Sequence, residues 1–110
     1  MSGTSPQRDF FSGVRHKVDV IAHRGGNGEW PGETLFAFEQ ARKFGVDALE
    51  MDIRVTRDGH LVMMHNITVR ATTNGWLPVR CYTLAETQKL DAAYHWGAEI
   101  RRKNIFVPTF

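Results

Sequence analysis

The sequence has little cysteine, no long apolar run and no excess of one charge, and each shortage excludes a class of protein. Cys81 is the only cysteine among 110 residues, so the chain has no internal disulfide. No apolar run approaches the roughly 20 residues that a membrane-spanning helix needs. The 14 basic and 12 acidic residues give a formal net charge of +2, and the basic residues are scattered. A nucleic-acid-binding surface is therefore not expected.

The N-terminal residues 1–17 are polar and mixed in charge, with Phe10-Phe11 as their only apolar pair. They lack the apolar core of a secretory signal, so the sequence predicts a flexible lead-in over 1–17 and a cytoplasmic protein. Residues 18–110 have the length of one domain. The hydrophobic content of 42% and the charged content of 24% are typical of a soluble globular chain.

A strand, a helix and a second strand are expected in the first half of this domain. The first strand covers 18–22 and stops at a glycine-rich loop. The helix runs from Glu33 or Thr34 to Phe44, and the second strand covers 46–56. This order predicts a βαβ unit with parallel strands and an α/β fold.

The expected helix carries signals at both ends and along one side. Thr34 is the predicted N-cap, and Gly45 is placed to end the helix in the left-handed conformation. Apolar residues spaced three apart are expected to form the buried face: Leu35, Phe38, Ala41 and Phe44.

The dipeptide Asp58-Gly59 predicts a two-residue β-hairpin turn. If the residues flanking this turn oppose each other, the numbers of opposed residues sum to 117, and Asp52 faces His65. Glu50 then lies on the same face, because residues two apart on a strand point the same way. Further along, Thr83-x-x-Glu86 has the pattern of a capping box and predicts a short helix to about Leu90.

Five polar residues lie in or beside the apolar runs, where burial is costly unless a charge is paired or binds a ligand: His23, Arg24, Glu50, Asp52 and His65. Two carboxylates suit Mg²⁺ or Ca²⁺. Two imidazoles can donate and accept protons near neutral pH, and a guanidinium can bind a phosphate bidentately. The set predicts a metal-assisted phosphate site.

Each of these residues also has an ordinary structural interpretation when it is taken alone. His23 could bond its own loop, and Arg24 could lie on the surface. The two carboxylates could face solvent from a strand, and His65 could be a core histidine with a satisfied partner. The combined spacing of the five residues favours the functional interpretation.

Several stretches together resemble the glycerophosphodiester phosphodiesterase family, over about residues 18–110: Ile21-Ala22-His23-Arg24-Gly25, Pro31-Gly32-Glu33-Thr34, Leu49-Glu50-Met51-Asp52, Thr56-Arg57-Asp58-Gly59, Val62-Met63-Met64-His65 and Thr72-Thr73-Asn74-Gly75. The resemblance implies a (β/α)₈ TIM barrel, of which 18–110 would be the N-terminal portion with a small insertion over 66–104. Because such a barrel needs about 250 residues, the barrel is expected to be incomplete and the segment truncated.

The resemblance also implies an activity, which is the hydrolysis of small-molecule glycerophosphodiesters to glycerol 3-phosphate and an alcohol in lipid metabolism. It assigns His23 and His65 as the catalytic acid–base pair and Arg24 as the phosphate-binding residue. It assigns Glu50 and Asp52 as ligands of a divalent metal, Mg²⁺ or Ca²⁺. A third metal carboxylate in the family pattern lies on a later strand, which this chain is expected to lack.

Three positions depart from the family pattern. Pro31-Gly32-Glu33-Thr34 stands where Pro-Glu-Asn-Thr is usual, which affects local support of the site. His65-Asn66 replaces His-Asp and loses a charge beside the histidine. Arg70-Ala71-Thr72-Thr73 replaces Asp-Arg-Thr-Thr within the insertion.

Two alternatives stay open on the sequence. One is a phospholipase D-like activity on lysophospholipids or sphingomyelin. The other is a truncated, non-catalytic fragment that binds a phosphate or a metal, and the 110-residue segment alone is expected to be inactive. No integral membrane segment is expected.

Overall fold

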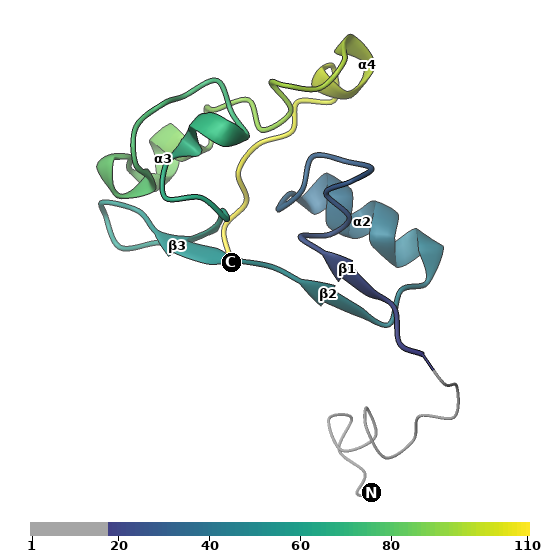
Figure 1. Cartoon of the computed structure of the whole chain (residues 1–110). Helices are drawn as coiled ribbons and strands as arrows, with labels where there is room; N and C mark the ends of the chain where they lie inside the picture. The colour runs from purple at the N-terminus through teal and green to yellow at the C-terminus, as the bar shows by residue number, and fades with distance from the viewer. Residues whose placement is uncertain (1–17) are drawn as a thin grey trace, which may run out of the picture.

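The structure is a computed structural model that describes residues 18–110; the predicted lead-in over 1–17 lies outside the described residues. The described part is an α/β arrangement of short strands and helices (Figure 1). In chain order its elements are β1 (Ile21–His23), α2 (Leu35–Phe44), β2 (Ala48–Glu50), β3 (Ile53–Val55), β4 (Leu61–Met63), two 3₁₀ turns (Val69–Ala71 and Val79–Cys81), α3 (Leu84–Thr87) and α4 (Ala98–Arg101).

The predicted βαβ unit is confirmed. β1 and β2 are parallel, in a register that places Ile21 beside Ala48 and His23 beside Glu50. Figure 1 shows α2 lying against this pair of strands. β1 begins at Ile21 rather than at residue 18, and the backbone N–H of Val20 donates to the side chain of Asp47 at 2.7 Å.

Both predicted ends of α2 are confirmed. The Thr34 hydroxyl accepts the N–H of Ala37 at 3.1 Å, and Gly45 ends the helix at φ 79° in the left-handed region. The predicted buried face is half wrong, because Leu35 and Phe44 are 57% and 76% exposed. A row of residues spaced three apart turns about 60° around the helix at each step, so it cannot stay on one side. The buried residues of α2 instead combine spacings of three and four: Ala37, Phe38 and Ala41.

The strand expected over 46–56 is divided into β2 and β3 at Met51-Asp52. β2 pairs with β1, whereas β3 pairs antiparallel with β4 in a second two-stranded sheet. At the break, the backbone N–H of Asp52 donates to the Glu33 carboxylate. The break therefore lies where the chain leaves one sheet and enters the other.

The predicted hairpin forms, but its predicted register is wrong. Ile53 pairs with Met63, so the numbers of opposed residues sum to 116. The loop has three residues, 57–59, because the N–H of Thr56 donates to the carbonyl of His60 at 2.8 Å. Gly59 at φ 85° supplies the left-handed residue that such a loop requires. Asp52 consequently lies opposite Met64, and the N–H of Met64 donates to the Asp52 carbonyl at 3.0 Å.

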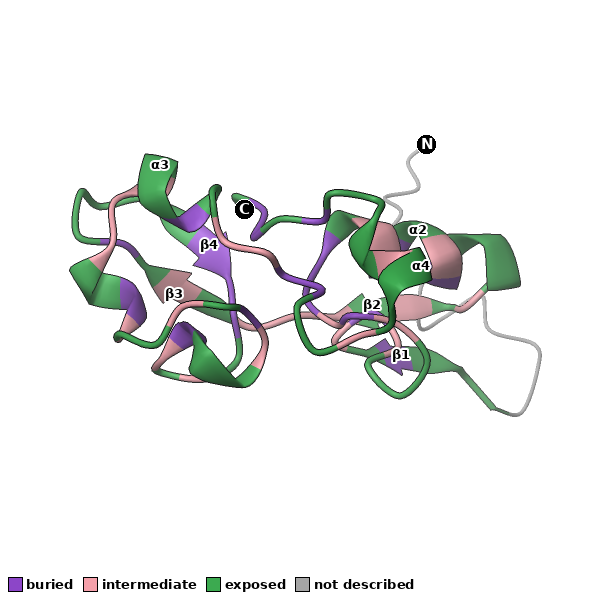
Figure 2. Cartoon of the chain, turned by 90° about the horizontal axis from the view of Figure 1, so that it is seen from above, coloured by how far each residue is buried: buried purple, intermediate pink, exposed green. Residues whose placement is uncertain are grey.

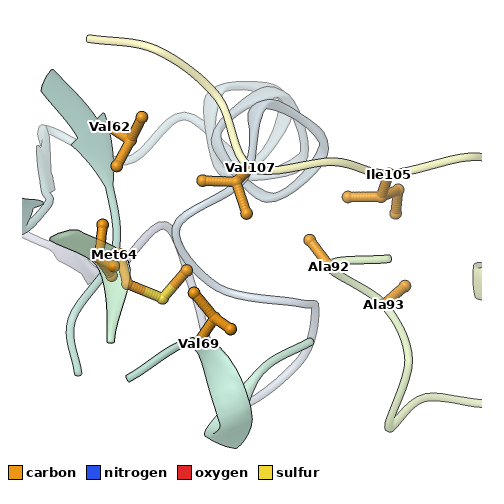
Figure 3. Packing of buried hydrophobic residues seen from close by; sticks show 8 residues of the cluster. Val62, Met64, Val69, Ala92, Ala93, Ile105 and Val107 are labelled. Atoms are coloured by element: carbon orange, nitrogen blue, oxygen red, sulfur yellow. The ribbon is translucent and has the colours of Figure 1, made fainter. Parts of the chain in front are cut away.

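The core lies beside β4 and is formed by residues from the second half of the chain (Figures 2 and 3). The C-terminal segment 105–110 runs along β4, and the N–H of Met63 donates to the carbonyl of Pro108 at 3.0 Å. Figure 3 shows side chains of both segments pointing toward one another. The buried cluster comprises Val62, Met64, Val69, Val79, Ala92, Ala93, Ile105 and Val107. This packing fixes β4 and Met64, the residue that precedes His65.

α3 begins at the predicted capping box, in which the side chains of Thr83 and Glu86 each accept the other residue's backbone N–H. It ends at Thr87, earlier than expected. No helix within residues 18–110 has the length and apolar character that would let it cross a membrane.

Candidate active site

The parallel register of β1 and β2 places the first part of the site at the C-terminal ends of both strands. His23 Nε2 lies 3.9 Å from Glu50 Oε1, and the backbone N–H of Arg24 donates to the same oxygen at 3.0 Å. Arg24 has φ 53°, so the chain turns sharply as soon as β1 ends. The Glu50 carboxylate thus contacts both His23, at the end of β1, and Arg24, in the loop that follows.

Glu33 forms the second part of the site, and sequence reasoning did not assign it a role there. Its side chain is nearly buried, with the residue 5% exposed, and both carboxyl oxygens accept the N–H of Asp52, at 3.1 and 3.0 Å. Its own N–H donates to the carbonyl of Arg24 at 2.8 Å, with φ 58°. Glu33 therefore joins the loop after β1 to the start of β3.

The two carboxyl groups of Glu33 and Asp52 also interact with each other. Burial, and then the hydrogen bond with the Asp52 side chain, raise the pKa of Glu33 from 4.5 to about 8. The same hydrogen bond lowers the pKa of Asp52. Glu33 thus holds the proton at neutral pH, and Asp52 remains an anion.

Asp52 is the electrostatic centre of the candidate site. Besides the bond from Glu33, its pKa is lowered by attraction to His65, Arg24 and His23, in that order. Three of the other predicted residues thus act on Asp52 through space, although Asp52 does not face His65 across the hairpin as predicted. Glu50, the fifth, contacts His23 and Arg24.

His65 lies two residues after the end of β4 and contacts two neighbours. The Arg54 guanidinium of β3 donates to the His65 carbonyl from Nε at 3.2 Å and from Nη2 at 2.7 Å. The His65 ring nitrogen Nδ1 lies 2.7 Å from Oδ1 of Asn66. The residue is exposed, and its ring is available to a ligand.

Arg24, Glu33 and His65 line one pocket, which Met64 and Trp96 also line. Arg24 Nε is buried and has no hydrogen-bond partner within 18–110. A buried guanidinium donor without a partner is costly, so this arrangement of Arg24 is not explained by the fold alone. His23 does not line this pocket; it lines a shallower one beside Gly26 and Trp30.

The residues present offer oxygen ligands to a cation, but they form no complete cage. Asp52 Oδ2 is buried and has no hydrogen-bond partner in the described part of the chain. Across residues 18–110 no group of three or more acidic, histidine or cysteine side chains is arranged to hold a metal. Glu50 and Asp52 are carboxylates, which is the ligand type of which Mg²⁺ commonly takes one or two while it keeps several waters.

The role of Glu33 could not have been read from local pattern, because its partner lies 19 residues away. Its position just before the helix N-cap accounts for its backbone conformation but not for its side-chain contacts. The one available signal was its place in the Pro31-Gly32-Glu33-Thr34 stretch, where the family pattern differs.

The chain is similar to known proteins both in sequence and in fold. The model of the "Glycerophosphoryl diester phosphodiesterase family" matches residues 23–110. A glycerophosphodiester phosphodiesterase of Caldanaerobacter subterraneus is 44% identical over 89 residues, which are 81% of this chain and 37% of that protein. The chain thus spans little more than a third of the length of this relative.

Solved structures agree with the sequence match. The crystal structure of a glycerophosphodiester phosphodiesterase from Agrobacterium tumefaciens is 32% identical, with a TM-score of 0.79 over 86% of this chain and 40% of that one. An Oleispira antarctica phosphodiesterase in complex with the product sn-glycerol-3-phosphate is also 32% identical, with a TM-score of 0.74 over 84% of this chain and 37% of that one.

Proposed function

Because the chain belongs to the glycerophosphoryl diester phosphodiesterase family, we propose that it carries the acid–base and phosphate-binding part of an active site that hydrolyses glycerophosphodiesters to glycerol 3-phosphate and an alcohol. The observations that carry this proposal are that Arg24 and His65 line one pocket and that His23 Nε2 lies 3.9 Å from Glu50 Oε1 at the ends of β1 and β2. The Oleispira relative binds that product, which supports the substrate class.

Each side chain has a role that follows from its surroundings. The guanidinium of Arg24, which lines the pocket, donates to a phosphate oxygen and stabilises the charge that builds there. His65, in the same pocket, and His23, beside Glu50, exchange protons with the attacking water and the leaving alcohol. Water attack and alcohol departure occur on opposite sides of the phosphorus, so two separate imidazoles suit an in-line displacement.

A divalent cation, Mg²⁺ or Ca²⁺, would be held by Glu50 and Asp52. When bound, it would withdraw charge from a phosphate oxygen. The support for this assignment is the chemistry of the two carboxylates, since oxygen ligands suit both ions.

We further propose that these residues are the N-terminal portion of a (β/α)₈ barrel and that the 110-residue chain alone does not turn over substrate. Each of the two sheets within residues 18–110 has two strands. Ile21 of β1 is 59% exposed, as expected of a sheet that further elements cover. The His23 side chain is 61% exposed, so water reaches the acid–base site and weakens its electrostatic interactions.

An exchange of this segment into a longer relative tests whether residues 18–110 support the activity, separately from whether the 110-residue chain is long enough to be active by itself. Residues 18–110 would replace the matching segment of the Caldanaerobacter relative, and glycerol 3-phosphate release from glycerophosphocholine would be measured with and without EDTA. The chimera is expected to be active and to lose its activity in EDTA. His23→Ala and His65→Ala in the chimera are each expected to lower kcat by about 10²-fold or more.

His60→Ala is the matched control, since His60 is a surface histidine of the hairpin, beside Asp58. If the chimera folds and either catalytic-histidine variant keeps full activity, the acid–base assignment is wrong. Release of a free alcohol from lysophospholipids or sphingomyelin, with no action on glycerophosphocholine, would identify the phospholipase D-like alternative. Metal-dependent turnover by the 110-residue chain itself would contradict the proposed need for further barrel elements.

A further inference from the structure

The side chain after His65 lies against one of its two ring nitrogens. Oδ1 of Asn66 lies 2.7 Å from Nδ1 of His65. An amide oxygen can only accept a hydrogen bond, so Nδ1 must be the donor. A neutral imidazole has one N–H, and Nε2 is therefore left with a free lone pair.

The backbone of His65 is fixed independently of the ring. The Arg54 guanidinium holds the His65 carbonyl with two donors, and Met64, the preceding residue, is 3% exposed in the core. The ring therefore moves mainly about its own side-chain bonds. The bond to Asn66 restricts that remaining freedom, while the residue itself lines the pocket with Arg24 and Glu33.

We infer that Asn66 is a positioning residue that holds His65 in the Nδ1–H tautomer and so presents Nε2 as a proton acceptor to the pocket. This inference rests on the proposed function, because it concerns the histidine that the function uses. When Nε2 takes a proton from water, an Nε2–H bond forms and the water O–H bond breaks. The water oxygen bonds to phosphorus while the P–O bond to the alcohol breaks, and the leaving oxygen takes a proton from the acid partner. The Nδ1–H bond to Asn66 persists throughout, so the ring does not have to turn.

The choice of an amide at this position has a chemical consequence. A carboxylate would also accept from Nδ1–H, but it would add a negative charge that favours the doubly protonated ring. Asn66 orients the ring without that charge. The departure from His-Asp to His65-Asn66 thus keeps the acceptor and omits the charge.

Tautomers can be measured on the intact 110-residue chain without any turnover. The chain would be labelled with ¹⁵N-histidine and studied by NMR in EDTA at a pH near 7.5, where an ordinary imidazole with a pKa of about 6.5 is mainly neutral. His65→Gln assigns the His65 signals. His60, which lies in the hairpin away from Asn66, is the internal reference for the fold.

The expected result is a single dominant Nδ1–H pattern for His65 in the wild type, and its loss to a mixture in Asn66→Ala with His60 unchanged. Asn66→Asp retains an acceptor and is expected to keep the Nδ1–H pattern. A wild-type His65 in the Nε2–H form would overturn the inference, as would an Asn66→Ala variant that keeps the wild-type pattern. An inactive chimera with the tautomer intact would instead refute the proposed function.

Discussion

The buried Glu33 carboxyl makes the stability of the chain depend on pH in a direction opposite to that of an ordinary salt-bridged acid. Its pKa rises from 4.5 in the unfolded chain to about 8 in the folded one, chiefly because of burial. Between these values the folded state binds the proton and the unfolded state does not, so stability falls as pH rises. The loss is on the order of a few kcal/mol over the whole window.

Glu33→Gln isolates this effect. Its amide oxygen can accept the Asp52 N–H, and its amide nitrogen can donate to the Asp52 carboxylate, as the protonated acid does. The free energy of unfolding would be measured with urea in EDTA from pH 5 to pH 8. The wild type is expected to lose stability relative to Glu33→Gln as pH rises, and histidine titrations shared by both proteins cancel in the difference.

Glu39→Gln is the matched control, because Glu39 is exposed and its pKa is lowered by the hydrogen bond from Arg42. It titrates below the window and leaves the curve parallel to that of the wild type. Asp52 also has a lowered pKa, so its contribution is lost only in more acidic solution. Parallel curves for the wild type and Glu33→Gln between pH 5 and pH 8 would refute the assignment of the proton to Glu33.

Two stability predictions concern the loop after β1 and the start of α3. Gly25→Ala is expected to destabilise the chain by about 1–3 kcal/mol more than Gly59→Ala in urea unfolding, because both glycines have positive φ but a Cβ at Gly25 would lie 2.5 Å from Phe38. Equal losses in the two variants would show that Phe38 moves freely. Thr83→Ala removes the hydroxyl that accepts the Glu86 N–H, and it is expected to cost about 1 kcal/mol in the same assay; Thr83→Ser, which keeps a hydroxyl, should recover most of it.

Local chemistry made the first half of the fold predictable. Thr34 and Gly45 end α2 through their own side chain and backbone, so neighbouring residues suffice to locate both ends. The strand–helix–strand order then fixes a parallel pair, which brings His23 beside Glu50. The strand order predicts the parallel pair but not its register, so the pairing of His23 with Glu50 comes from the structure.

Features that depend on a single residue of register, or on distant partners, could not be predicted in this way. Asp58-Gly59 fits both a two-residue and a three-residue loop, and the Thr56–His60 hydrogen bond selects the longer one. That one-residue difference places Asp52 opposite Met64. His65 still acts on Asp52 electrostatically, because charge interactions tolerate a displacement that a strand register does not.

The altered stretch before α2 illustrates how a change of residue can preserve the chemistry of a site. Gly32 is confined by its neighbours, since a Cβ there would lie 2.6 Å from the Cβ of Asn27, so a side chain does not fit without movement. Glu33, where the family pattern has Asn, carries a proton at neutral pH because its pKa is about 8. A protonated carboxyl donates one hydrogen bond and accepts others, as an amide does. Glu33 can therefore support Asp52 as an amide would, until alkaline pH removes its proton and sets two anions against each other.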